Sequence, residues 1–323
     1  MVALFITACS TSQKEQNENF SYTVDAFADM QILRYRVPQV EALSVRQKEL
    51  LYYLTEAALN GRDILYDQNG KYNLLVRRTL EAVYTNYDGD KNTADFCAFE
   101  TYLKRVWVSN GIHHHYGNDK FVPEFSQAFF ENEVNKLPVS SIEKIGVSRS
   151  EILATLIPVI FDPEVAARRL VQDSGVDLIQ ASACNYYEGV SQTEAEEFYN
   201  AMKSPADETP ISYGLNSKLV RQDGVLVEKT YKIGGLYSAA IEKIVYWLEK
   251  AQSVAENEQQ QFVISKLIEY YRTGDLKTFD DYSIAWVNDT ASHIDFVNGF
   301  IETYGDPLGM KASWESLVNF KNT

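Results

Sequence analysis

A short stretch near the end of this sequence combines residue types that could do chemistry. Residues 299–309 read GFIETYGDPLG, which mixes acids and aromatic residues with apolar ones. If the first part of this stretch is a strand, its alternation places Glu302 and Tyr304 on the same face. A carboxylate beside a phenol suits the capture of an ammonium group and the donation of a hydrogen bond to a carbonyl oxygen. The alternative is an ordinary strand edge with an exposed acid and a packed tyrosine.

Histidine is scarce, and its positions offer one possible metal site. His113, His114 and His115 are consecutive, and His293 stands alone. In an extended segment His113 and His115 point to one side and could chelate a metal. Because the triplet follows Asn110-Gly111, a helix-stop signal, we instead expect a polar loop in which the ring nitrogens meet carbonyl groups or water. We expect His293 to pack at the start of a strand.

Several catalytic signatures are absent from the sequence. It contains no H-E-x-x-H, no paired C-x-x-C, no G-x-S-x-G, no Walker A loop and no G-x-G-x-x-G before a helix. The sequence therefore predicts no self-contained zinc-peptidase helix, hydrolase nucleophile elbow or nucleotide-binding fold. We expect this chain to bind no metal and to have no peptidase activity on its own.

The first residues are typical of a bacterial lipoprotein signal. Residues 1–8 are uncharged and mostly apolar, Cys9 follows a small residue, and residues 10–19 are all polar. This pattern predicts lipid attachment to Cys9 and a flexible tether after it, although a basic segment before the apolar one is missing. It implies a location in the bacterial cell envelope. The alternative is a buried first strand in a cytoplasmic protein.

Composition excludes several other classes of protein. The 323 residues are 45% hydrophobic and 23% charged, which is enough apolar content for a large core. The formal charge is −15, so nucleic acid is not the expected partner. No apolar run is long enough to cross a bilayer, so membrane contact is expected only through the lipid anchor. Cys97 and Cys184 are expected to be buried free thiols, although a disulfide between them is the alternative.

Helical periodicity dominates the rest of the chain, and strands are few. Helices are expected at about 45–60, 72–87, 93–108, 149–161, 164–172, 193–202, 236–253, 257–272 and 279–287, the first capped by Ser44 and ended by Gly61. Residues 217–229 alternate on both sides of Asp223-Gly224, which predicts a hairpin. Weaker strand signals lie at 30–37 and 176–183. The fold class predicted is therefore α+β with helices in the majority.

The stretch at 299–309 resembles the dipeptidyl-peptidase III family of zinc exopeptidases. The family pattern is G-F-I-E-x-Y-x-D-P-x-G, followed by a basic residue and then by an aromatic residue and Glu, which are here Lys311, Trp314 and Glu315. Residues 44–66, 110–123 and 181–194 are similar to the bacterial branch of this family. The resemblance covers about residues 20–323.

The resemblance implies a two-lobed enzyme with a wide cleft. Its zinc is held on the upper lobe by H-E-x-x-G-H and E-E-x-R motifs, and this sequence contains neither. The resemblance therefore implies a truncated product or a fragmentary gene, with a tether at 1–19 and an incomplete lower lobe at 20–323. That lobe has a small β-barrel-like sheet core surrounded by helices. Zinc and the missing upper lobe would then be this chain's cofactor and partner in the complete protein.

The resemblance also implies roles for individual residues. Glu302 matches the carboxylate that holds the free N-terminal ammonium of an oligopeptide, which restricts the enzyme to dipeptide release. Tyr304 matches the tyrosine that donates to the scissile carbonyl oxygen, and Glu315 matches a further acid of the cleft. Lys311 and the pair Ala312-Ser313 depart from the usual family residues, which affects the expected surroundings of Glu315. The competing interpretations are a non-catalytic envelope lipoprotein that binds peptides or a partner protein, and a gene fragment without activity.

Overall fold

The computed structural model describes residues 20–321, and its contacts divide the chain into two compact units at Leu43/Ser44. Cys9 and the predicted tether at 1–19 lie outside the described residues. In the first unit, β1 (Thr23–Phe27) pairs antiparallel with β2 (Met30–Leu33), and a short 3-10 helix, η1 (Val40–Ala42), follows. The weak strand signal at 30–37 therefore corresponds to a shorter strand.

The second unit is mainly helical. Its helices are α2 (Val45–Asn60), α3 (Arg62–Asn69), α4 (Asn73–Asn86), α5 (Ala94–Ser109), α6 (Gln127–Lys136), α7 (Val139–Ile145), α8 (Arg149–Phe161), α9 (Leu178–Ala181), α10 (Gln192–Asn200), α11 (Ser238–Ser253), α12 (Glu258–Thr273) and α13 (Leu276–Val287). None of the helices in the described part of the chain is both long and apolar enough to span a bilayer. Most of the helices expected from periodicity are present within a few residues of their predicted ends.

Local capping explains where α2 begins, and a distant contact explains why a glycine follows its last residue. Ser44 and Gln47 form a capping box at the start of the helix, as the sequence predicts. Gly61 follows the helix without a left-handed conformation, so it is not a C-cap glycine of the usual kind. A Cβ at Gly61 would lie 2.0 Å from the ring of Trp314, so glycine is required here by the approach of a side chain far along the sequence.

Two local predictions between α8 and α10 are wrong. Residues 164–172 contain a turn up to Ala166 and then irregular chain instead of a helix, because Ala166 has a positive φ and its carbonyl accepts a hydrogen bond from His113. The neighbouring carbonyl of Val165 is bound by the Lys120 ammonium. Residues 176–183 contain the short helix α9 instead of a strand, since the Asp177 carboxylate accepts the N–H groups of its first turn.

The strands of the second unit form two small sheets. In one, β3 (Tyr187–Glu188) lies parallel to β4 (Ser217–Gln222), which pairs antiparallel with β5 (Val225–Thr230). Asp223 and Gly224 join β4 to β5 with positive φ at both positions, which confirms the predicted hairpin. In the other, β6 (Ile294–Glu302) pairs antiparallel with β7 (Ser313–Phe320). The α+β class is confirmed, and the described residues form no closed barrel.

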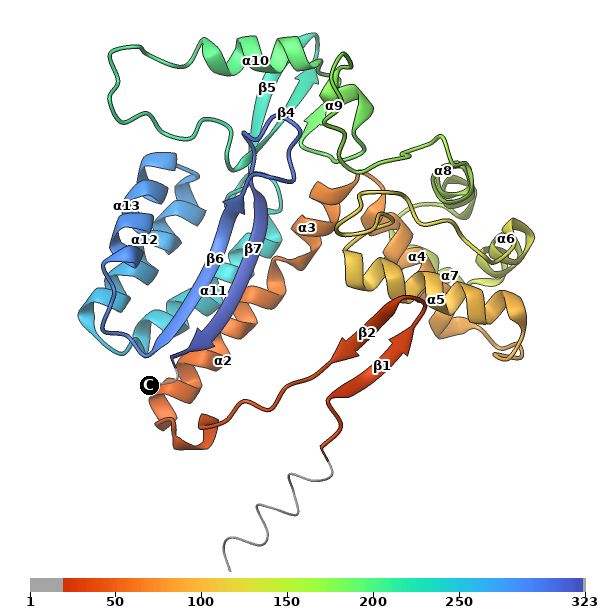
Figure 1. Ribbon diagram of the computed structural model, residues 1–323, viewed down its shortest axis with the longest axis horizontal. Coiled ribbons are helices and arrows are strands. Elements are labelled where there is room, and N and C mark those ends of the chain that lie inside the picture. The colour runs from red at the N-terminus through yellow and green to blue at the C-terminus, as the bar shows by residue number, and fades with distance from the viewer. Residues whose placement is uncertain (1–19, 322–323) are drawn as a thin grey trace, which may run out of the picture. The chain divides into compact units, whose positions relative to one another are not determined.

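The β6–β7 ribbon lies among helices, as Figure 1 shows. Helix α2 contacts both strands and packs on α11; α11 packs in turn on α12, and α12 packs on α13. The ribbon buries Phe296, Phe300 and Trp314 on one face, while Leu317 on the opposite face is exposed. A second group of helices is formed by α4 with its neighbours α5 to α8. The ribbon thus has one core face and one face available for other contacts.

Candidate functional site

A β-bulge near the end of β6 decides which face carries Glu302. Phe300 lies opposite Trp314 and Glu302 lies opposite Ser313, so Ile301 is an extra residue in β6. Residues opposite each other in an antiparallel pair share a face. Without the bulge Glu302 would follow Phe300 onto the core face, whereas the bulge moves it to the face of Ser313. Alternation along β7 places Glu315 on this same face.

Glu302, Tyr304 and Glu315 lie close enough to influence one another. Burial and then the charge of Glu302 raise the pKa of Glu315 above its usual value. Burial and then the charges of Glu315 and Glu302 raise the pKa of Tyr304. Glu302 is exposed, Glu315 is half-buried, and Tyr304 is 67% exposed. Tyr304 lies in the turn after β6, so the strand alternation expected from the sequence does not extend to it, although it does lie beside the acids.

The turn that carries Tyr304 is held by a buried carboxylate. Asp306 is 1% exposed, and its Oδ2 accepts the N–H groups of Met310 and Lys311, both at 2.8 Å, and the hydroxyl of Tyr187 at 3.0 Å. Burial raises the pKa of Asp306. The conformation of residues 303–311 is therefore fixed against β3, where Tyr187 lies.

Lys311 ties the same turn to the β4–β5 hairpin. Its ammonium is fully buried and donates to the hydroxyl of Tyr199 at 2.6 Å and to the carbonyl of Ser217 at 3.1 Å. The carboxylate of Glu228 accepts hydrogen bonds from both of these residues, which brings a negative charge near the ammonium. Burial lowers the pKa of Lys311 to about 8. None of its hydrogen bonds to described residues involves Glu315. Lys311, which departs from the usual family residue, therefore stabilises the turn and does not contact Glu315 through a hydrogen bond.

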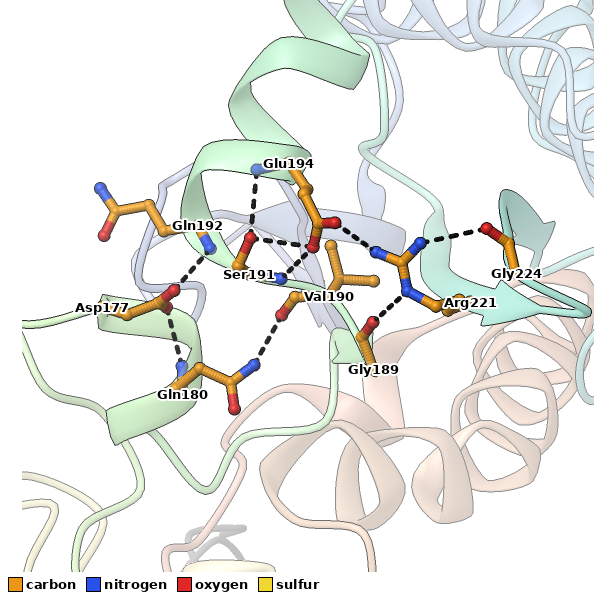
Figure 2. Close-up of polar contacts among 9 residues, drawn as sticks. All are labelled: Asp177, Gln180, Gly189, Val190, Ser191, Gln192, Glu194, Arg221 and Gly224. Carbon is orange, nitrogen blue, oxygen red and sulfur yellow. Dashed lines mark hydrogen bonds and ion pairs between the residues drawn. The ribbon is translucent and has the colours of Figure 1, made fainter.

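The segment around α10 is locked to the same sheet, as Figure 2 shows. Arg221 on β4 donates to the Gly189 carbonyl at 2.9 Å and pairs with Glu194. Glu194 also forms a capping box with Ser191 at the start of α10. The Asp177 carboxylate accepts the N–H of Gln192 at 3.0 Å. These contacts fix the positions of Tyr187 and Tyr199. Both tyrosines form hydrogen bonds with residues of the turn at 303–311.

In the loop that contains His113 and His114, the histidine rings form hydrogen bonds with backbone groups of the described residues. His113 is 3% exposed, and its Nε2 donates to the Ala166 carbonyl at 2.7 Å. Burial lowers the pKa of His113 to about 4, so the ring is neutral. His114 Nδ1 accepts the N–H groups of Tyr116 and Gly117. These contacts agree with the expected loop.

Arg169 connects this loop to the candidate site. Its guanidinium donates to Asn118 Oδ1 at 2.9 Å, to Asn69 Oδ1 at 3.1 Å and to the His115 carbonyl at 3.2 Å. Its charge also acts on Tyr304, where it opposes the rise in pKa. Arg169 therefore joins the loop to α3 beside the turn that carries Tyr304. No motif in the sequence indicated it.

The remaining candidate residues lie elsewhere. His293 directly precedes β6, and its ring lies 5.8 Å from that of Phe320. Cys97 and Cys184 are free as expected, but Cys97 is exposed and Cys184 is half-buried, so the expectation of two buried thiols is wrong for Cys97 and only partly met for Cys184. Cys97 lies on α5 outside the apolar stripe that faces the core. Burial raises the pKa of Cys184 to about 12, which makes it an unreactive thiol.

The chain is similar to known peptidases. A family model described as Peptidase family M49 matches residues 190–323, which include the whole β6–β7 ribbon and its acids. Dipeptidyl peptidase 3 from Nematostella vectensis is 23% identical and covers 71% of this chain and 35% of its own length. The protein of the same name from Homo sapiens is 22% identical and covers 87% of this chain and 42% of its own length.

Solved structures show the same relationship at the level of the fold. Dipeptidyl-peptidase III from Caldithrix abyssi superposes with a TM-score of 0.57 at 18% identity, over 89% of this chain and 41% of its own. Dipeptidyl-peptidase III from Corallococcus sp. strain EGB superposes with a TM-score of 0.57 at 15% identity. This match covers 92% of the present chain and 42% of the Corallococcus chain. The matched region and the fold are therefore those of the M49 peptidases. Residues 190–323 thus match peptidase family M49, and most of the chain is similar to dipeptidyl peptidases III, although it spans less than half the length of these relatives.

Proposed function

We propose that this chain provides the substrate-binding half of the cleft of a zinc-dependent dipeptidyl peptidase, which releases dipeptides from the N-terminus of oligopeptides. Residues 20–323 would then be the lower lobe. The observation that carries the proposal is the bulge at Ile301, which brings Glu302 to the face of Glu315, beside Tyr304. This cluster lies in the region that matches the family model.

The two acids suit the binding of an ammonium group. Burial and then the charge of Glu302 raise the pKa of Glu315, and a cation placed near both acids would offset the repulsion between them. Glu302 is the more exposed acid, so it is assigned the contact with the N-terminal ammonium. A charge-assisted hydrogen bond there would fix how far the peptide enters the cleft. Glu315 would add the second negative charge.

Tyr304 suits a role at the scissile bond. Its raised pKa keeps the phenol protonated at neutral pH, so it can donate a hydrogen bond. Such a donor stabilises the oxygen of a carbonyl as negative charge develops on it. Tyr304 lies in the turn that follows Glu302. If Glu302 holds the amine of a bound peptide, the Tyr304 hydroxyl would lie beside a carbonyl group further along that peptide.

In the proposed enzyme, the zinc would be held by residues other than those described here. In residues 20–321 no cluster of three or more His, Cys, Asp or Glu side chains is arranged to hold a metal ion. The residues present therefore do not fit a catalytic zinc, which needs three protein ligands. This chain alone is expected to bind peptides without cleaving them.

A blocked substrate tests the proposal. Acetylation removes the ammonium charge while leaving the rest of the peptide unchanged. A longer polypeptide that contains this chain and a metal centre should release dipeptides from free peptides on the order of 10²-fold faster than from acetylated ones, because a charged hydrogen bond is lost. If this polypeptide binds free peptides without cleaving them, the non-catalytic peptide-binding class is correct instead.

A location in the bacterial cell envelope is proposed separately, on the residues around Cys9. A lipid attached to the thiol would be the membrane anchor. We expect Cys9→Ser to move the protein from the membrane fraction to the soluble fraction, with Cys97→Ser as the control. Metabolic labelling with a radioactive fatty acid should give a signal that Cys9→Ser abolishes. Unchanged fractionation of Cys9→Ser would contradict a lipid anchor at this position.

A further inference from the structure

One edge of β7 is completed by a side chain instead of a strand. Ser313 pairs with Glu302, so the backbone groups of its neighbours, Ala312 and Trp314, point to the opposite edge. Gln68 on α3 lies at that edge. Its Oε1 accepts the N–H of Trp314 at 2.8 Å, and its Nε2 donates to the carbonyl of Ala312 at 2.9 Å. The side-chain amide thus makes one hydrogen bond to a carbonyl and one to an N–H of β7, which backbone groups of an adjacent strand would otherwise make.

Gln68 has little freedom to leave this position. Its side chain is 1% exposed, and Ala312 and Trp314 are 0% and 4% exposed. If the amide rotated away, a buried N–H and a buried carbonyl would both lose their partners. The backbone carbonyl of Gln68 also accepts the N–H of Asn185 at 2.8 Å. The end of α3 is thereby fixed to the segment before β3 as well as to β7.

The two hydrogen bonds of Gln68 lie on either side of Ser313, the residue opposite Glu302. Gln68 holds the residues on either side of Ser313, and Ser313 itself donates to the Glu302 carbonyl at 3.1 Å. Glu315 is the next residue after Trp314. A movement of the start of β7 would therefore change the spacing between the two acids directly, while the far end of the ribbon could remain in place.

We infer that Gln68 is a positioning residue that holds β7 against the bulge in β6 and so sets the spacing of Glu302 and Glu315. Its effect on peptide capture rests on the proposed function. Its effect on the strand does not, and the two can therefore be tested separately.

The chain offers a matched control at the other end of the ribbon. Gln260 on α12 is also 1% exposed, and its Nε2 donates to the Ile294 carbonyl at 2.8 Å, at the start of β6. Its Oε1 accepts the N–H of Glu256 at 2.8 Å. Gln260→Leu thus removes a buried amide of the same kind from the same ribbon. It should lower stability without affecting the acids, which separates positioning from general destabilisation.

The first experiment uses this chain and Gln68→Leu. Amide hydrogen exchange of Trp314 should become about tenfold faster than in the parent, since its N–H loses its acceptor. The pKa of Glu315, followed by NMR of the side-chain carboxyl carbons, should shift measurably. Gln260→Leu should leave both quantities at their parent values. If Gln68→Leu changes neither, or if Gln260→Leu changes both equally, the inference is wrong.

A second variant keeps the test usable if Gln68→Leu does not fold. In Gln68→Glu, a protonated carboxyl can donate to Ala312 and accept from Trp314, as the amide does, whereas the ionised form has no donor. The Trp314 exchange rate, divided by the parent rate at the same pH, should therefore be near one at low pH and rise as the carboxyl ionises. A ratio that does not depend on pH would contradict the proposed pair of bonds.

The functional step is tested in the longer polypeptide. Gln68→Leu should raise KM for peptides with a free amine several-fold, with a smaller change in kcat, because the spacing of the acids acts on capture. A change in the strand without a rise in KM would overturn the inference. Equal cleavage of free and acetylated peptides by the parent would instead reject the proposed function and leave the role of Gln68 in the strand intact.

Discussion

Tyr304→Phe is expected to lower kcat by about 10²-fold and to leave KM nearly unchanged in a longer polypeptide that supplies the metal centre. The phenol hydrogen bond strengthens only when negative charge develops on the carbonyl oxygen, so its loss affects the transition state more than the bound substrate. Steady-state kinetics with a chromogenic dipeptide substrate would measure both constants. Tyr304 is 67% exposed, so the substitution should not change the free energy of unfolding noticeably.

Tyr246→Phe is the control for this experiment. Tyr246 lies on α11, is 52% exposed, and is not part of the candidate site. Its substitution should leave kcat and KM at their parent values. If Tyr304→Phe had the full kcat of the parent, the role assigned to Tyr304 would be wrong, even though the similarity to dipeptidyl peptidases III would stand.

Asp306→Ala is expected to lower the free energy of unfolding by about 3–5 kcal/mol. The substitution leaves the N–H groups of Met310 and Lys311 and the hydroxyl of Tyr187 without the acceptor they share. All three donors are in a buried region, so water cannot replace the carboxylate without cost. Urea unfolding of this chain, followed by circular dichroism, would measure the change.

Two further variants complete this series. Asp306→Asn keeps one oxygen acceptor and should cost less than Asp306→Ala. Asp173→Ala removes an exposed carboxylate and should change the free energy of unfolding by less than about 0.5 kcal/mol. If Asp306→Ala changed the free energy of unfolding as little as Asp173→Ala, the turn that carries Tyr304 would not depend on the buried carboxylate.

Elements with strong local signals could be predicted from the sequence. Ser44 and Gln47 form the capping box at α2 from side chains only three residues apart. The β4–β5 hairpin follows from Asp223 and Gly224, which accept the positive φ values of its turn. The acids and the tyrosine of the candidate site were recognisable because they lie within one short motif.

Features that depend on distant contacts could not be predicted. The helix expected at 164–172 is absent because its carbonyls are bound by His113 and Lys120, which lie some fifty residues earlier. The bulge at Ile301 has no signature in the order of residues, yet it decides the face of Glu302. Gln68 and Arg169 each form their bonds with residues remote in the sequence, so no periodicity or motif indicated them.

The most direct test of the central claim compares free and acetylated peptides on the parent and on Glu302→Gln. The parent should lose on the order of 10²-fold in kcat/KM when the substrate is acetylated. Glu302→Gln should lose far less on acetylation, because only the parent has a charged contact with the amine. Glu143→Gln, which removes an exposed acid on α7, should behave like the parent. An equal loss for the parent and Glu302→Gln would show that Glu302 does not hold the amine.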